Sequence, residues 1–295
     1  MEFPGLARTR GAIGRFRRQL RRRMLEPIVL GNRSLRETVL NALSARGHLV
    51  YCRQPEGHFF VDPADRVVGH WLMWREGWQR QDVGRITEIL AAAGRLPADA
   101  VFVDAGANIG THTVYALQSG RFARVLACEP EPKNLQLLEM NMAANSLSSR
   151  VRIIPKALGA QAGTATLHLH PRNKGGHSLR WNPSYDGKAT VDVPVVRLDA
   201  LLQEEAIAAE TIGVVWIDTE GFEPQVVEGL GDFLGRVPLA IEYAPKRYAP
   251  ADAARLRELL QQHYQTFHLL SGDRPSAQPI SALAALTGIT DVLVF

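Results

Sequence analysis

The sequence predicts an α/β fold in which a doubly wound, mostly parallel sheet occupies about residues 95–295. Three observations predict this class. Short, unbroken apolar runs such as AVFVD (100–104) and VVWID (214–218) are typical of strands that are buried on both faces. The runs alternate with helical segments, as parallel strands with crossover connections require. A glycine-containing turn, GANIG (106–110), follows the first run and leads into a helix.

The N-terminal segment carries the basic charge of the chain. Residues 1–23 hold eight arginines and one glutamate, a formal charge of +7, so the remaining residues total −3 of the overall +4. Apolar residues recur here at helical spacing and predict a basic amphipathic helix: Ile13, Phe16, Leu20, Met24 and Ile28. Such a helix packs on its own protein or lies on an anionic membrane. No secretory apolar region follows the arginines, because Glu26 and Pro27 interrupt MLEPIVL.

Residues 34–99 predict a small helical and stranded extension before the sheet. Ser34 and Glu37 fit a capping box for a helix that ends near Ala45. HLVYC (48–52), HFFVD (58–62) and RVVG (66–69) predict short strands, and a helix follows at about 80–93. We therefore expect three parts: a helical extension at 1–50, a subdomain at 51–99 and a main domain at 100–295 with a flap at about 160–197.

The main domain alternates strands and helices in a regular order. The predicted strands are 100–104, 124–129, 151–158, 214–218, 239–243, one near 266–270 and 291–295. The predicted helices begin at about Gly110, Pro132, Glu223 and Ala251. In such a sheet, ligands bind beyond the carboxyl ends of the strands, at the first strand-to-helix turn.

That turn favours one adenosine-containing cofactor over another. Gly106, Asn108 and Gly110 form G-x-N-x-G, which differs from the G-x-G-x-x-G of dinucleotide-binding folds. Glu129 ends the second strand, where a carboxylate binds ribose hydroxyls. Asp104 would repel the diphosphate of NAD but attract the sulfonium and ammonium of S-adenosylmethionine. We therefore favour S-adenosylmethionine, and an NAD-dependent oxidoreductase is the first alternative.

Four segments together resemble the FkbM-like family of S-adenosylmethionine-dependent methyltransferases: VDAGANIGTHT, CEPEPKNLQLLEMN, ALG (157–159) and WIDTEGFEPQVVEGL. FVDPADRV and EGWQ extend the resemblance, which spans about residues 55–245. It implies a Rossmann-like class I methyltransferase with a seven-stranded sheet whose last strand is antiparallel. It implies a cofactor site comprising Asp104, Gly106, Asn108, Gly110, Thr113, Glu129, Asn134 and Ala157. It also implies O-methylation of a hydroxyl on a sugar, glycan or polyketide-like metabolite.

Asp218 and Glu220, in WIDTEG, are the first candidates for the catalytic base. A hydroxyl is weakly acidic, so its methylation benefits from a general base. Both residues follow a central strand at its carboxyl end; helix capping and ion pairing are the alternative roles. His177, in the polar segment 168–187, is the third candidate, as a base or a substrate contact. His112 is expected to cover the cofactor, and Glu242 to contact substrate or lie paired in the core.

Metal and nucleic acid are not expected. His168 and His170 form H-x-H, which could ligate a metal with Asp218, but we expect surface roles and no metal requirement. The chain lacks the [DN]-P-P-[YF] segment of many nucleic-acid methyltransferases, and its basic residues concentrate in the tail. Cys52 and Cys128 lie far apart, in no disulfide framework, which suits a reduced cytoplasmic protein. The expected partner is a small-molecule or glycan acceptor, with membrane contact through the tail; a non-catalytic binding module is the second alternative.

Overall fold

The computed structural model describes residues 32–75, 77–181, 189–271 and 277–295. The predicted amphipathic helix at 13–28 lies outside these residues. The chain divides into two compact units, residues 1–49 with 62–64 and residues 50–61 with 65–295. No helix among the described residues has both the length and the hydropathy that a bilayer crossing requires.

The first unit contains α2 (Arg33–Ser44). The predicted capping box at Ser34 is wrong, because the helix begins one residue before it. Asn32 is the N-cap: its backbone is extended, and its side-chain oxygen accepts a hydrogen bond from the Leu35 N–H at 3.1 Å. Asparagine is as favourable an N-cap residue as serine. The helix begins directly after Asn32, the earlier of the two residues in the chain.

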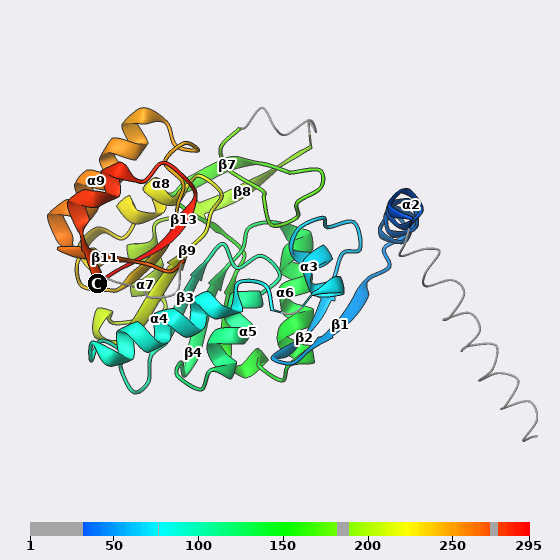
Figure 1. The fold of residues 1–295 in the computed structure, drawn as a ribbon, viewed down its shortest axis with the longest axis horizontal. Coiled ribbons are helices and arrows are strands. Elements are labelled where there is room, and N and C mark those ends of the chain that lie inside the picture. Colours follow the sequence, from blue (N-terminus) through cyan, green and yellow to red (C-terminus); the bar gives the residue numbers. More distant parts are fainter. Residues whose placement is uncertain (1–31, 76, 182–188, 272–276) are drawn as a thin grey trace, which may run out of the picture. The chain divides into compact units, whose positions relative to one another are not determined.

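The second unit contains an eight-stranded sheet in the order β12-β11-β13-β10-β9-β3-β4-β5 (Figure 1). Five strands are parallel: β3 (Val101–Ala105), β4 (Arg124–Cys128), β5 (Val151–Ile154), β9 (Ile212–Ile217) and β10 (Leu239–Tyr243). Three strands complete it: β11 (Thr266–Leu269), β12 (Ala277–Pro279) and β13 (Thr290–Val294), the last antiparallel to β10. The doubly wound, mostly parallel class is confirmed, and the edge strand β12 adds to the seven strands expected. The strand order reverses between β3 and β9, which is where ligands bind in such sheets.

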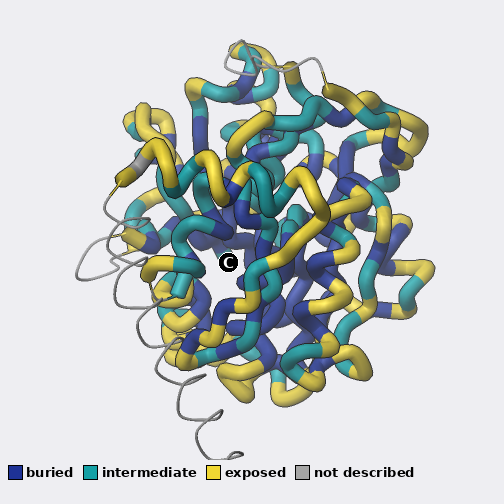
Figure 2. Tube along the Cα trace, turned by 90° about the vertical axis from the view of Figure 1, so that its right-hand side faces the viewer, coloured by how far each residue is buried: buried dark blue, intermediate teal, exposed yellow. Residues whose placement is uncertain are grey.

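Alternate residues of each strand enter two hydrophobic cores on the two faces of the sheet. Val101 and Val103 pack with α7 (Leu198–Glu204), α8 (Glu223–Glu228) and α9 (Pro250–His263). Phe102, on the opposite face, packs with α4 (Arg80–Ala92), α5 (Thr111–Gln118) and α6 (Pro132–Ala144). Figure 2 shows buried segments in the interior with exposed segments around them. Burial on both faces explains why the strands are apolar without alternation.

Two other predicted elements differ in the structure. Two of the three predicted short strands are present as β1 (Val50–Gln54) and β2 (Gly57–Val61), which pair antiparallel, but the strand predicted at 66–69 is wrong. That stretch starts α3 (Val68–Trp74), because the Asp65 carboxylate accepts the N–H groups of Val67 and Gly69 at 3.1 and 2.7 Å. A carboxylate at the start of a helix satisfies N–H groups that have no partner in the helix.

The predicted strand 151–158 is two strands. It breaks at Pro155, so that β5 joins the large sheet and β6 (Ala157–Leu158) joins a separate three-stranded sheet with β8 (Thr190–Val196) and β7 (Gly163–His168). This small sheet carries the segment between β7 and β8, of which residues 169–181 are described.

Candidate active site

Two adjoining cavities lie at the carboxyl edge of the large sheet. The first, of about 550 Å³, is lined by residues that follow β3, β4 and β5 and by Leu167, His177 and Leu179. The second, of about 690 Å³, is lined by polar side chains, by Trp78 and by Val67 and Val68. The two cavities share five lining residues: Gly106, Asn108, Gly175, Asp218 and Glu220.

The glycine turn after β3 forms the floor that the cavities share. The N–H groups of Gly106 and Ala107 both donate to the Cys128 carbonyl, at 3.1 and 2.9 Å, which holds the turn against β4. Gly106 has φ +92°, and a Cβ there would overlap the backbone carbonyl of Asp218. Only glycine combines this backbone conformation with so close a contact.

Glu129 presents a fixed carboxylate to the first cavity. Its Oε2 accepts the Asn108 N–H and its Oε1 accepts the Glu131 N–H, both at 2.8 Å. Burial raises the pKa of Glu129 to about 7, and the two backbone hydrogen bonds oppose that rise. Each oxygen keeps a further lone pair, so the carboxylate can accept hydrogen bonds from two neighbouring hydroxyls.

The predicted cofactor residues fall into two groups. Gly106, Asn108, Glu129, Asn134 and Ala157 line the first cavity. The other three, Asp104, Gly110 and Thr113, line neither cavity and lie beneath the turn.

Those three residues support the turn from below. Asp104 is fully buried, and its Oδ2 accepts a hydrogen bond from the Thr113 hydroxyl at 2.6 Å. Burial raises the pKa of Asp104 to about 6. Gly110, at φ +87°, caps the start of α5. Their placement points to shaping the turn, and direct cofactor contacts by them stay a prediction.

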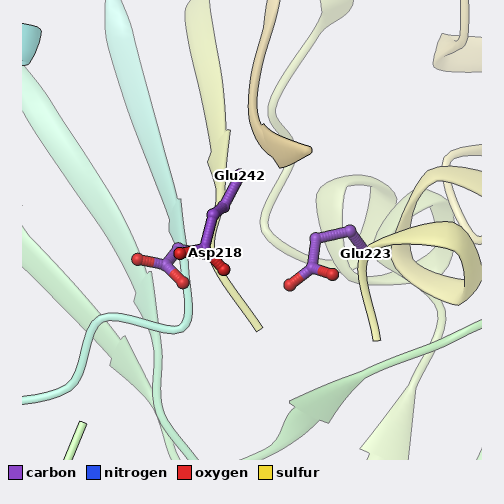
Figure 3. A group of neighbouring side chains, drawn as sticks. All are labelled: Asp218, Glu223 and Glu242. Atoms are coloured by element: carbon purple, nitrogen blue, oxygen red, sulfur yellow. The ribbon is translucent and has the colours of Figure 1, made fainter. Parts of the chain in front are cut away.

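Three acidic side chains, Asp218, Glu223 and Glu242, lie close to one another (Figure 3). Oxygen atoms of Asp218, Glu223 and Glu242 lie within 4.8 Å of one another. Asp218 follows β9, Glu242 lies on β10 and Glu223 begins α8.

The partners of these carboxylates differ. Glu223 accepts the N–H groups of Thr219, at 2.8 Å, and Gly221, at 3.1 Å, so it holds the loop after β9. Arg247 Nη1 bridges Glu242 at 2.6 Å and Glu220 at 2.7 Å. The Asp218 carboxylate forms no hydrogen bond or ion pair with any described residue. It is the one member of the group that is free to act on a ligand.

The protonation of Asp218 follows from its surroundings. Burial, and then the nearby charges of Glu242 and Glu220, raise the pKa of Asp218 well above its usual range. Burial raises the pKa of Glu242 to about 8 for similar reasons, although Arg247 opposes it. The ionised form of such a group is a stronger base than an exposed carboxylate, and a positively charged ligand beside it would favour that ionised form.

His177 lines the first cavity and not the second. Its Nδ1 accepts the His170 N–H at 2.9 Å, and burial lowers the pKa of His177 to about 4. The neutral ring therefore carries its proton on Nε2, which makes it a hydrogen-bond donor at this site. This arrangement favours a binding role for His177 over the role of base.

The predicted H-x-H alternative for a metal has no support in the geometry. His170 Nδ1 accepts the N–H groups of Arg172 and Asn173, and His168 pairs with Ser178 across a β-bridge. In the part of the chain that the structure describes, neither histidine joins Asp218 in a group of metal-ligating side chains.

The residues of the second cavity that were not predicted to line an acceptor site include Trp78, Gln79, His112 and Arg247. Arg247 lies in the turn after β10, and the turns after neighbouring parallel strands meet at one edge of a sheet. That rule could have identified it. The other three had local signals that did not point to an acceptor: Trp78 and Gln79 lie in EGWQ, and His112 follows the glycine turn.

Comparisons with known proteins find similarity to methyltransferases. The profile of the methyltransferase FkbM domain matches residues 104–268. Methyltransferase sdnD of Sordaria araneosa is 32% identical over 162 residues, which cover 46% of this chain and 62% of that protein. The 2-O-methyltransferase NoeI of Sinorhizobium fredii is 26% identical over 148 residues, which cover 44% and 57%. The chain thus spans about three fifths of the length of these relatives. The crystal structure of an FkbM methyltransferase from Methylobacillus flagellatus is 18% identical, with a TM-score of 0.43 over 71% of this chain and 48% of that one.

Proposed function

The chain belongs to the FkbM methyltransferase family, and on that premise we propose that it transfers a methyl group from S-adenosylmethionine to a hydroxyl of a small-molecule or glycan acceptor. The observation that carries this proposal is the position of Asp218. Its free carboxylate borders both cavities, so a donor in the first and an acceptor in the second would meet beside it.

The first cavity suits an adenosine-containing cofactor. Glu129 offers two fixed oxygens for ribose hydroxyls, and the glycine turn allows a ligand to approach the backbone closely. Asn108 places a side chain where a dinucleotide fold would have bare glycine. Family membership and this side chain both favour S-adenosylmethionine over NAD.

The second cavity suits the acceptor. It is lined by Asp218, Glu220, Glu242 and Arg247, with Trp78 as part of its wall. When bound, S-adenosylmethionine supplies an electrophilic methyl group. Methylation of a hydroxyl releases one proton, and the Asp218 carboxylate is placed to receive it. Much of the remaining rate enhancement would come from holding the two reactants in line.

The acceptor class rests on one relative. The name of NoeI describes a 2-O-methyltransferase, and this relative is 26% identical to the chain over 148 residues. We therefore propose a hydroxyl oxygen as the methylated atom. A sugar or glycan hydroxyl is the preferred acceptor.

Calorimetry and a product assay test the proposal together. S-adenosylhomocysteine should bind with a dissociation constant in the micromolar range, and NADH should show no binding at the same concentrations. Incubation with S-adenosylmethionine and a panel of methyl glycosides should then release S-adenosylhomocysteine in equal amount to methylated sugar. Binding of NADH in place of S-adenosylhomocysteine would support the oxidoreductase. Cofactor binding without turnover of any hydroxyl acceptor would support a binding module.

A further inference from the structure

His112 lies on the first turn of α5 and lines the second cavity but not the first. Its side chain is 5% exposed, and its ring lies 4.2 Å from the ring of Trp216, centroid to centroid. Trp216 lies on β9 and Asp218 directly follows this strand, and both His112 and Asp218 line the second cavity. His112 and Asp218 are therefore placed to contact the same bound molecule.

The imidazole of His112 has no hydrogen-bond partner among the described residues, and its Nε2 is sealed from solvent. An unpaired buried polar group costs about 1–3 kcal/mol, and native structures rarely retain one without a role. Burial lowers the pKa of His112 to about 3, so the ring is neutral. A neutral imidazole has one donor and one acceptor nitrogen. A hydroxyl group, which both donates and accepts, is a suitable partner.

The charges around the second cavity restrict the ligand further. Asp218, Glu220 and Glu242 line it, and among the residues that the structure describes Arg247 is the one arginine or lysine that does so. Glu220 and Glu242 both pair with Arg247 Nη1, so the charge of this guanidinium is already balanced by neighbouring carboxylates. An anionic acceptor would lie beside buried carboxylates with no free counter-charge, which is unfavourable in a site of low dielectric.

We propose that His112 binds a second hydroxyl of the acceptor, adjacent to the hydroxyl that Asp218 deprotonates, so that the enzyme selects uncharged vicinal diols. This inference rests on the proposed function and narrows its acceptor class. It assigns His112 to the acceptor, whereas the sequence suggested that this residue covers the cofactor. The residue acts in specificity, since Asp218 takes the proton and His112 orients the neighbouring hydroxyl.

The test compares methyl glycosides with their monodeoxy analogues. In the wild-type enzyme, removal of the hydroxyl beside the methylated one should lower kcat/KM by about 10–100-fold, the usual effect of a buried hydrogen bond that loses its partner. In His112→Phe, which keeps a ring against Trp216, the same removal should change kcat/KM by less than about threefold. His112→Asn keeps one donor and one acceptor, so it should restore part of the discrimination. A methyl glucuronide should be a poorer acceptor than the matching glucoside for the wild-type enzyme.

The outcomes separate this inference from the proposed function. Binding of S-adenosylhomocysteine should be the same in His112→Phe and the wild type, because His112 does not line the first cavity. Methyl transfer with equal discrimination by both proteins would overturn the inference and leave the proposed function standing. Efficient methylation of monohydroxy or anionic acceptors would overturn it as well. Absence of methyl transfer to every glycoside would contradict both.

Discussion

At the scale of single residues, the partners of a carboxylate decide its role in this site. Glu223 and Asp218 belong to the same cluster, yet Glu223 holds a loop through backbone N–H groups while Asp218 has no partner among the described residues. The sequence pattern WIDTEG placed Asp218 and Glu220 together as candidate bases. It could not distinguish them, because Arg247, which binds Glu220, lies 27 residues further along the chain.

A change of Glu129 to glutamine tests the cofactor side of the site. Glu129→Gln keeps the size of the side chain but removes the charge that accepts the ribose hydroxyls. We expect binding of S-adenosylhomocysteine to weaken by about 1.5–3 kcal/mol, the usual value for a hydrogen bond to a charged group. Calorimetry measures the change. Glu205→Gln is the matched control, since Glu205 pairs with Arg152 away from both cavities. Equal affinities of the two variants would contradict the role of Glu129.

At the scale of elements, the sequence predicted strands best where burial leaves a uniform signal. Long apolar runs identified the strands of the parallel sheet, and the helices between them followed from spacing. The errors in the predicted strands came from single residues that interrupt an apolar run or precede it. The Asp65 carboxylate accepts an N–H group at the start of α3, so the RVVG stretch leads into a helix. The predicted strand 151–158 is interrupted at Pro155, and its two halves belong to different sheets. Such effects depend on single side chains and on tertiary pairing that periodicity does not encode.

Replacing Gly106 tests whether the turn after β3 requires its backbone conformation. Gly106→Ala places a Cβ against the Asp218 carbonyl at φ +92°, so we expect a lower Tm and weaker cofactor binding. The strain should cost about 1–3 kcal/mol. Gly84→Ala is the control, because Gly84 lies within α4 with no atom within 4 Å of a new Cβ. That variant should gain about 0.5–1 kcal/mol. Differential scanning calorimetry compares them, and a stable Gly106→Ala protein with normal affinity would contradict the account.

At the scale of the whole molecule, buried acids make stability depend on pH. Burial raises the pKa of Glu129 and of Asp291 to about 7 and that of Glu242 to about 8. In the unfolded chain these groups ionise near pH 4, so above that pH the folded state retains protons that the unfolded state has lost. Stability therefore falls as pH rises through the folded pKa values.

We accordingly expect the Tm of the ligand-free protein to fall between pH 6.5 and 8.5. The lowered pKa values of His112 and His177 act in the opposite direction, but only below the ordinary histidine pKa of 6.5. Thermal unfolding followed by circular dichroism measures the slope. Glu242→Gln should flatten it, because a neutral amide does not titrate. A Tm that rises with pH across this window would disprove the assignment of raised pKa values.

The arginine-rich segment adds a proposal about localisation. Residues 1–23 carry +7, and each basic residue near an anionic membrane contributes about 1 kcal/mol of attraction. We expect the full chain to sediment with phosphatidylserine vesicles at low salt and to be released at high salt. A chain that starts at residue 32 should stay in the supernatant under both conditions. Equal sedimentation of the two proteins would rule out attachment through this segment.

The central claim is that Asp218 acts at the junction of the two cavities, and Asp218→Asn tests it most directly. The substitution keeps the size of the side chain and removes its basicity. Calorimetry should find the affinity for S-adenosylhomocysteine within about threefold of the wild type, because Glu129 and the glycine turn remain. Turnover with a methyl glycoside acceptor should fall by about 10²–10⁴-fold, the range for loss of a positioned acid–base group. Wild-type turnover by Asp218→Asn would contradict the account.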